Sequence, residues 1–153
     1  MGEIELLVGL NVPDTTAITA FHTLKRMGFS SLNGVKRREY YCFAVDDSAR
    51  EYEEKLGRTD ILVNANKHSF VIGEKGRVIA PAGGETGVLV TEKDDSCSGI
   101  LSVLRERLGF TAIYSMRKGT LWLLAFERQD KAQAREIAER LLCSRHYQQY
   151  EVV

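Results

Sequence analysis

Three histidines and two pairs of adjacent aspartates are the first candidates in this sequence for metal ligands or for general acids and bases. His22, His68 and His146 are far apart and lack the short spacing, such as i, i+4 on a helix, that brings two imidazoles to one metal ion. The acidic pairs Asp46-Asp47 and Asp94-Asp95 each precede a predicted helix, where carboxylates bind free backbone amides and favour the helix dipole. We therefore predict that these acids cap helices, and we predict neither a metal site nor a catalytic pair.

The cysteines and glycines also lack the pattern of a reactive or cofactor-binding site. Cys42, Cys97 and Cys143 are an odd, widely spaced set without a C-x-x-C motif, which predicts neither a disulfide framework nor a zinc site and is typical of a reducing compartment. Cys97 lies where a predicted helix begins, a position that can lower a thiol pKa, but free cysteines usually pack as small apolar groups. The glycines of residues 73–76 and 83–84 lack the spacing of a phosphate-binding loop, so we predict no cofactor.

Basic residues gather at two positions, residues 36–38 (Lys-Arg-Arg) and residues 117–118 (Arg-Lys). Each run falls between two strand-like segments, so we predict that both occupy the turns of β-hairpins, at residues 36–39 and 117–120. A turn on a rigid sheet holds such side chains outward, which suits contact with an acidic partner or an anion, whereas solvated surface charge is the alternative. The predicted partner-binding residues are therefore Lys36, Arg37, Arg38, Arg117 and Lys118.

The overall composition excludes several classes of protein. The chain has 153 residues, 44% of them hydrophobic, and its 21 basic residues balance 21 acidic ones. A neutral chain lacks the basic surface that binds phosphate backbones, so we expect no nucleic-acid partner. Apolar runs such as residues 61–63 and 121–126 are far shorter than the ~20 residues of a membrane-spanning helix, and residues 1–4 lack the features of a signal peptide. We expect a cytoplasmic globular protein with no membrane contact.

An internal repeat predicts which elements position these residues. Residues 24–29, which end in Met-Gly-Phe, match residues 105–110, which end in Leu-Gly-Phe, at an offset of 81 positions. With one deletion, residues 61–64 then match residues 141–144. Successive matches in one register indicate a duplication, and the segment between the copies is rich in glycine. We divide the chain into a first repeat at residues 1–72, a linker at residues 73–86 and a second repeat at residues 87–153.

Each repeat has the pattern strand, helix, strand, strand, helix, strand. In the first repeat, Asp14 and Gly28 are predicted to begin and end the first helix, as an N-cap and a left-handed stop. The second helix, expected after residues 46–48, contains Gly57. The uninterrupted helical pattern of residues 133–142 predicts that this helix continues to about Val63, at a cost of about 1 kcal/mol for the glycine. The other predicted elements are strands at residues 4–10, 32–35, 40–45, 69–72, 88–91 and 150–153 and helices at residues 96–108 and 130–143.

Two βαββαβ units predict an α+β fold of ferredoxin-like type, in which the helices cover one face of each antiparallel sheet. Each repeat has only about 70 residues, too few to bury both faces of its sheet alone. We therefore expect the two units to pack about a pseudo-two-fold axis, as a pseudo-dimer within one chain.

Short motifs in both repeats resemble PurS, the small subunit of phosphoribosylformylglycinamidine synthase. The second repeat carries them at residues 107–110, 116–119, 141–144 and 150–152, and the first at residues 27–29, 35–36, 61–64 and 70–71. Members of that family are shorter, single-copy chains that dimerise, so this chain is similar to two fused copies and to the PurS-dimer-like N-terminal domain of the large single-chain synthases. It departs from the family in the hairpin Gly-Lys pair, which is replaced by Arg38-Glu39 and by Gly119-Thr120.

The resemblance implies a non-catalytic adaptor subunit in purine biosynthesis. Such a subunit helps to dock a glutaminase subunit on a synthetase subunit, and these convert formylglycinamide ribonucleotide to its amidine with glutamine and ATP. The catalytic residues would then lie in the two partners, and this chain would need no cofactor. A homodimer of the whole chain is left open.

Two other functions remain as alternatives. Residues 11–14 (Asn-Val-Pro-Asp) precede a helix and, together with the repeat, would also suit a tandem ACT-like regulatory module that binds an amino acid between its copies. Such loops usually have glycine where Asp14 stands. A small enzyme on a dimeric ferredoxin-like barrel would need a catalytic constellation, and the sequence shows none.

Overall fold

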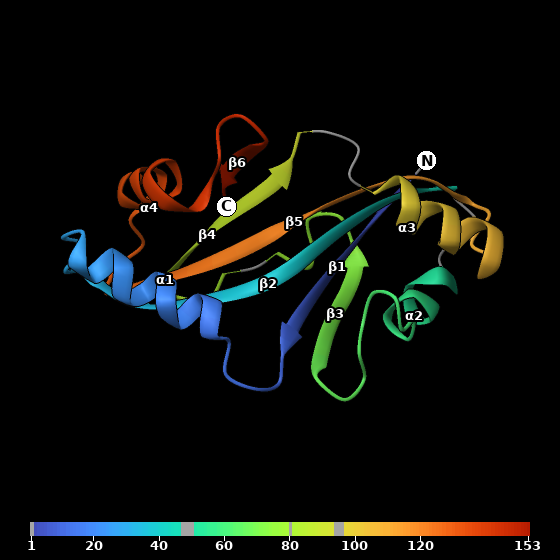
Figure 1. The fold of residues 1–153 in the computed structure, drawn as a ribbon, viewed down its shortest axis with the longest axis horizontal. Coiled ribbons are helices and arrows are strands. Elements are labelled where there is room, and N and C mark those ends of the chain that lie inside the picture. The colour runs from blue at the N-terminus through green and yellow to red at the C-terminus, as the bar shows by residue number, and fades with distance from the viewer. Residues whose placement is uncertain (1, 47–50, 80, 94–96) are drawn as a thin grey trace.

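The two longest strands, β2 (Leu32–Val45) and β5 (Ile113–Phe126), lie at the centre of a six-stranded antiparallel sheet (Figure 1). The computed structural model describes residues 2–46, 51–79, 81–93 and 97–153. The strand order is β3-β1-β2-β5-β4-β6, with β1 at Gly2–Leu10, β3 at His68–Glu74, β4 at Glu85–Glu92 and β6 at Gln148–Val152. The protein therefore has an α+β fold, as predicted.

Four helices lie within the described residues, and none of them is long and apolar enough to cross a membrane. They are α1 (Thr15–Arg26), α2 (Tyr52–Gly57), α3 (Ser98–Ser102) with its π-helical continuation η2 (Val103–Arg107), and α4 (Lys131–Ile137) with its π-helical continuation η3 (Ala138–Leu142). The side chain of Asp14 caps α1, as predicted, and that of Asp130 caps α4. The predicted caps at Asp47, Asp94 and Asp95 lie outside the described residues. The predicted cap at Asp46 was wrong, because α2 follows Glu51 without a side-chain cap and Asp46 instead accepts the Tyr114 hydroxyl at 3.1 Å.

The pairing of β2 with β5 joins the two halves of the chain edge to edge. Glu39 lies opposite Thr120, which is its own counterpart at the 81-residue offset of the repeat. On either side of it, Arg38 pairs with Leu121 and Tyr40 pairs with Gly119. These two pairs are equivalent, because Gly119 is the counterpart of Arg38 and Leu121 is the counterpart of Tyr40 at the same offset. The register is thus symmetric about the Glu39–Thr120 pair, and each half contributes three strands in the same order from its outer edge.

The two predicted hairpins are absent, and this part of the prediction was wrong. β2 and β5 run without a turn through residues 36–39 and 117–120, so each half is a βαβαβ unit rather than a βαββαβ unit. The pairing between the halves explains this, because residues 35–44 of β2 pair without interruption with residues 115–124 of β5 and keep the backbone extended. Gly119 also lacks the positive φ that a two-residue hairpin turn requires.

The second helix is shorter than predicted, since α2 ends at Gly57 and does not continue to Val63. The amide of Arg58 donates to the carbonyl of Lys55, and that of Thr59 to the carbonyl of Leu56, which tightens and closes the last turn. A Cβ atom at Gly57 would lie 2.1 Å from the ring of Phe70 in β3. The glycine therefore gives space for this strand, a role that the repeat pattern could not show.

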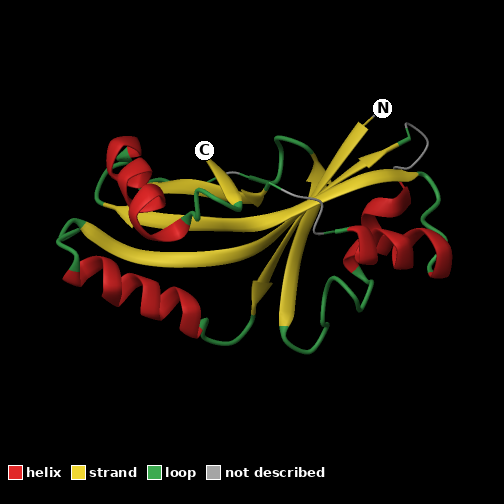
Figure 2. Ribbon diagram, turned by 45° about the horizontal axis from the view of Figure 1, so that its top comes forward, coloured by secondary structure: helices red, strands yellow, loops and turns green. Residues whose placement is uncertain are grey.

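All of these helices cover the same face of the sheet, in two pairs at its two ends (Figures 1 and 2). α1 and α4 pack with Trp122 and Leu124 in one apolar core. α2 and α3 pack with Ile4, Tyr41 and Phe43 in a second core at the other end. The helices therefore leave the middle of this face to the side chains of β2 and β5.

The predicted linker is packed against the opposite face of the sheet. Its residues 75–79 and 81–84 connect β3 at one edge with β4 on the other side of the central strands. Val78 and Ile79 pack there on a smaller apolar cluster formed by Leu7, Tyr40, Cys42, Leu89 and Leu121. The connector is thus part of the core on this face.

Candidate functional site

The basic residues predicted at hairpin tips lie instead in the middle of the sheet, on both of its faces. Side chains alternate along a strand, so Arg37 and Lys118 share the helix-covered face with Trp122. Lys36, Arg38 and Arg117 lie on the face that the connector crosses. The structure therefore does not bring the predicted residues together as two outward-pointing tips.

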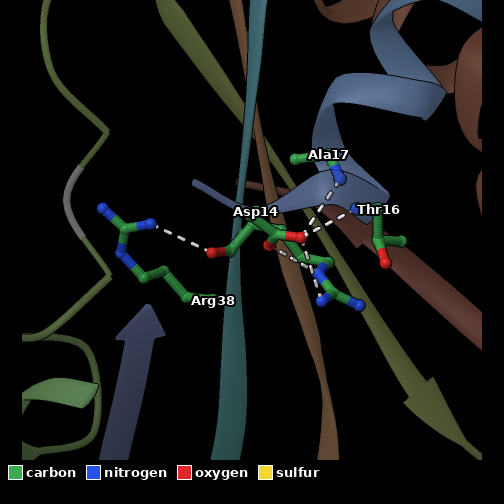
Figure 3. A network of polar contacts seen from close by, with 5 residues as sticks. Asp14, Thr16, Ala17 and Arg38 are labelled. Atoms are coloured by element: carbon green, nitrogen blue, oxygen red, sulfur yellow. Dashed lines mark hydrogen bonds and ion pairs between the residues drawn. The ribbon is translucent and has the colours of Figure 1, made fainter. Parts of the chain in front are cut away.

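Arg37 is held by an ion pair with Asp14. Its Nε lies 2.9 Å from Asp14 Oδ2 and its Nη2 lies 3.2 Å from Asp14 Oδ1. The same carboxylate accepts the amides of Thr16 and Ala17 at 3.1 and 3.2 Å, and Figure 3 shows it at the start of α1. The guanidinium also lies 6.0 Å from the ring centroid of Trp122. Arg37 thus fixes α1 to β2, and the predicted outward orientation of this side chain was wrong.

The other four basic residues differ in their contacts with the rest of the protein and in their exposure to solvent. The guanidinium of Arg38 points away from Asp14 and donates to the carbonyl of Arg37 at 3.0 Å (Figure 3). The Lys36 ammonium lies 3.6 Å from Glu85, on a side chain that is 64% exposed. Arg117 and Lys118 are exposed. Lys36, Arg117 and Lys118 are thus exposed, although Lys36 pairs with Glu85 and the Arg117 guanidinium also interacts with the Cys42 thiol, whereas Arg37 and Arg38 serve mainly the fold.

The Asp14 ion pair changes the titration of the carboxyl. Burial by itself raises the pKa of Asp14, but the hydrogen bond and charge of Arg37 and the two amides of α1 outweigh burial. The pKa of this carboxyl therefore lies below its usual value. The charge of Asp14 is thus used within the fold, between the start of α1 and Arg37 of β2.

Removing the Asp14 carboxylate should destabilise the protein more than removing an ordinary helix cap. We expect Asp14→Ala to lower the free energy of unfolding by about 1–3 kcal/mol, because α1 loses its cap and Arg37 its partner. Asp130→Ala is the matched control, because Asp130 caps α4 through the Gln133 amide at 3.0 Å, and it should cost about 1 kcal/mol. Urea unfolding at neutral pH measures both losses. Equal losses would contradict a stabilising role for the Arg37 pair.

The same contact predicts a pH dependence. Because the folded-state pKa of Asp14 is lowered, its contribution is fully present above the unfolded-state pKa of about 3.9 and is lost as the pH falls through the folded-state value. Asp14→Asn keeps an oxygen for the cap but carries no charge. The stability difference between wild type and Asp14→Asn should therefore shrink below about pH 4.

A buried polar cluster that the sequence did not predict lies on the connector face. Glu5 of β1 is only 2% exposed, and its carboxylate accepts the Tyr40 hydroxyl at 2.5 Å and the Gly76 amide at 2.7 Å. Burial, followed by the hydrogen bond to Glu5, raises the pKa of Tyr40. Burial also raises the pKa of the neighbouring Cys42 thiol, although the nearby Arg117 guanidinium acts in the opposite direction. The raised pKa values keep Tyr40 and Cys42 in their neutral forms, and the Glu5 carboxylate accepts two hydrogen bonds. The cluster therefore anchors the connector rather than forming a reactive centre.

A shallow groove of about 390 Å³ lies between α1 and the segment that ends α4. The hydroxyl-bearing residues Thr15, Thr16, Thr19 and Thr23 contribute to its lining on α1, together with Leu141 and Trp122. The lining offers hydroxyls and apolar carbon, which suit a neutral group better than the paired charges of a free amino acid.

The histidines and cysteines are dispersed in the structure. His22 lies in α1, and the Nδ1 of His68 accepts the Asn64 amide at 3.0 Å. Cys42 and Cys97 are buried, and all three cysteines are free thiols. Among the described residues, no group of three or more His, Cys, Asp or Glu side chains is arranged to hold a metal ion.

No protein-family model matches this sequence, and no curated protein matches it at a significant level.

Proposed function

We propose that this protein is a non-catalytic adaptor, built from two duplicated PurS-like units, that bridges the glutaminase and synthetase subunits of phosphoribosylformylglycinamidine synthase. The observation that carries the proposal is the symmetric register of β2 and β5, which makes one continuous sheet from two halves of like topology.

Duplication is supported by features at equivalent positions. Gly28 and Gly109 both have positive φ, at 105° and 81°, and each ends a helical segment. Each is followed by a buried phenylalanine, Phe29 and Phe110, that packs under the helices of its own end of the sheet. These matches follow the 81-residue offset of the sequence repeat, so they support a common origin for the two halves.

A fused pair of this kind suits an adaptor because its two halves offer related but unequal surfaces. At the symmetry centre, Glu39 of one half faces Thr120 of the other, and Arg38 corresponds to Gly119. An exact two-fold dimer presents the same surface twice, whereas this chain can present a different surface to each of two partners. Lys36 and Arg117, which are equivalent by the repeat, remain as exposed charges on the connector face.

The direct test is reconstitution with the synthetase and glutaminase subunits of the same organism. We expect the three chains to elute together from a gel-filtration column and glutamine-dependent amidine formation to require this chain. If the two catalytic subunits associate and turn over fully without it, while this chain elutes alone, the proposal is wrong.

Reversal of the two exposed charges should weaken assembly, and urea unfolding of the variant should show a loss of no more than about 1 kcal/mol in stability, because Lys36 and Arg117 are exposed. We expect Lys36→Glu with Arg117→Glu to slow association with an acidic partner surface and to flatten its salt dependence, because peripheral charges act mainly on the encounter rate. Lys55→Glu with Lys131→Glu makes the same change in net charge on exposed helix positions and serves as control. Stopped-flow or surface-binding kinetics at low and high salt distinguish them. Identical kinetics for the two double variants would show that Lys36 and Arg117 do not contact the partner.

A further inference from the structure

Strand β3 forms one edge of the sheet, and within the described residues it is paired only with β1 (Figure 1). The Lys75 amide donates to the carbonyl of Glu3, and the Asn11 amide donates to the carbonyl of Lys67. These bonds show that the backbone N–H and C=O groups of the odd-numbered residues of β3 point toward β1. In an antiparallel pair the backbone groups of alternate residues point away from the partner strand. The N–H and C=O groups of Phe70 and Ile72 therefore point outward from the sheet.

The central residues of this edge strand lack the features that usually protect an edge. Residues 70–72 (Phe-Val-Ile) contain neither charge nor proline, and their register with β1 is continuous, without a bulge. Val71 is 58% exposed and Phe70 39% exposed. The opposite edge, β6, is shorter and places a charge at Glu151. An apolar edge with outward backbone groups is suited to the addition of another strand.

We propose that β3 pairs with β3 of a second copy of this chain, antiparallel and about a two-fold axis at Val71, to form one sheet across two molecules. This register places Phe70 of each copy opposite Ile72 of the other, so that four backbone hydrogen bonds form around the axis. The next hydrogen-bonded pair, two residues along the strand, places the imidazole of His68 opposite the carboxylate of Glu74, which is a complementary pair. No other two-fold centre on β3 brings these two side chains opposite each other.

The central residue provides a specific test, because in this register Val71 of one copy lies opposite Val71 of the other. We expect the wild type to dimerise in sedimentation velocity over a dilution series. Val71→Lys and Val71→Glu should each raise the dimer dissociation constant by about tenfold or more, since they place like charges opposite each other. An equimolar mixture of the two variants should restore the dimer. Ile18→Lys, at a 46% exposed position on α1, is the matched control and should leave dimerisation unchanged.

Amide hydrogen exchange then locates the contact. In the wild-type dimer the amides of Phe70 and Ile72 should exchange slowly, and in Val71→Lys they should exchange at the rate of exposed amides while the inner amide of residue 71 stays protected by β1. A wild type that stays monomeric would overturn the proposal and leave this edge to a strand of a different protein. A dimer that persists in Val71→Lys, or that the mixture fails to restore, would overturn it as well.

Discussion

Replacement of Gly119 by alanine should strongly destabilise this protein, with a loss of about 3–5 kcal/mol in the free energy of unfolding. A Cβ atom at this position would lie 2.1 Å from the carbonyl oxygen of Val90 and 3.1 Å from the Cα of Thr91. Both neighbours are backbone atoms of β4, so no side-chain rotation can relieve the contact. Relief requires β4 to move away from β5, which breaks their ladder and opens the core beneath α4.

Gly34→Ala is the matched control for this prediction. Gly34 also lies in a central strand, but a Cβ atom there would meet only the Ala125 side chain, at an ordinary distance of 3.9 Å. We expect this change to be neutral or slightly stabilising, because alanine reduces the entropy of the unfolded chain. Urea unfolding of the two variants measures the difference. A Gly119→Ala variant as stable as Gly34→Ala would show that β4 does not pack so closely on β5.

Gly119 also shows why the sequence misled the prediction of the hairpins. The run of residues 117–120 (Arg-Lys-Gly-Thr) has the polar and glycine-containing composition of a turn. In the structure the glycine is needed for the close approach of β4, which lies nearly thirty residues earlier in the chain. Local composition could not distinguish a turn from a close contact between strands, because the deciding neighbour is distant in the sequence.

Local signals predicted those elements whose stability is itself local. The cap at Asp14, the left-handed Gly28 and the apolar periodicity of α1 all act within a few residues, and the observed helix matches the prediction. The end of α2 depends instead on the contact between the ring of Phe70 and Gly57. The orientation of the Arg37 side chain depends on its ion pair with Asp14. These contacts cross between elements, so the pattern of the sequence indicated the residue types but not their partners.

Glu5 is the clearest case of a residue that the sequence analysis missed. A single acid within the apolar strand of residues 4–10 is a signal that can be read from the sequence, because alternation in a strand covered on both faces leaves no exposed position for it. Its partners could not be predicted in this way, since Tyr40 and Gly76 lie in a different strand and in the connector.

Loss of the Glu5 carboxylate should have the second largest effect and should also release the connector. Glu5→Ala leaves the buried Tyr40 hydroxyl without its acceptor and frees the amide of Gly76 in the connector, so we expect a loss of about 2–4 kcal/mol in the free energy of unfolding. Tyr40→Phe should cost about 1–3 kcal/mol, because Glu5 keeps only the amide. In a double-mutant cycle the two changes should couple by about 0.5–3 kcal/mol.

Limited proteolysis distinguishes the anchoring role from a general loss of stability. Trypsin cleaves after Lys75 and Arg77, which flank the anchored Gly76, so Glu5→Ala should be cut at these sites in the native state well before the rest of the chain is digested. Glu3→Ala is the control, because it removes only the exposed pair with Lys75 at 3.0 Å and should cost less than about 1 kcal/mol. If Glu5→Ala unfolds more easily but is cut no faster at residues 75 and 77 than Glu3→Ala, the carboxylate stabilises the sheet through Tyr40 alone. The connector would then be held by Val78 and Ile79 packing on the sheet.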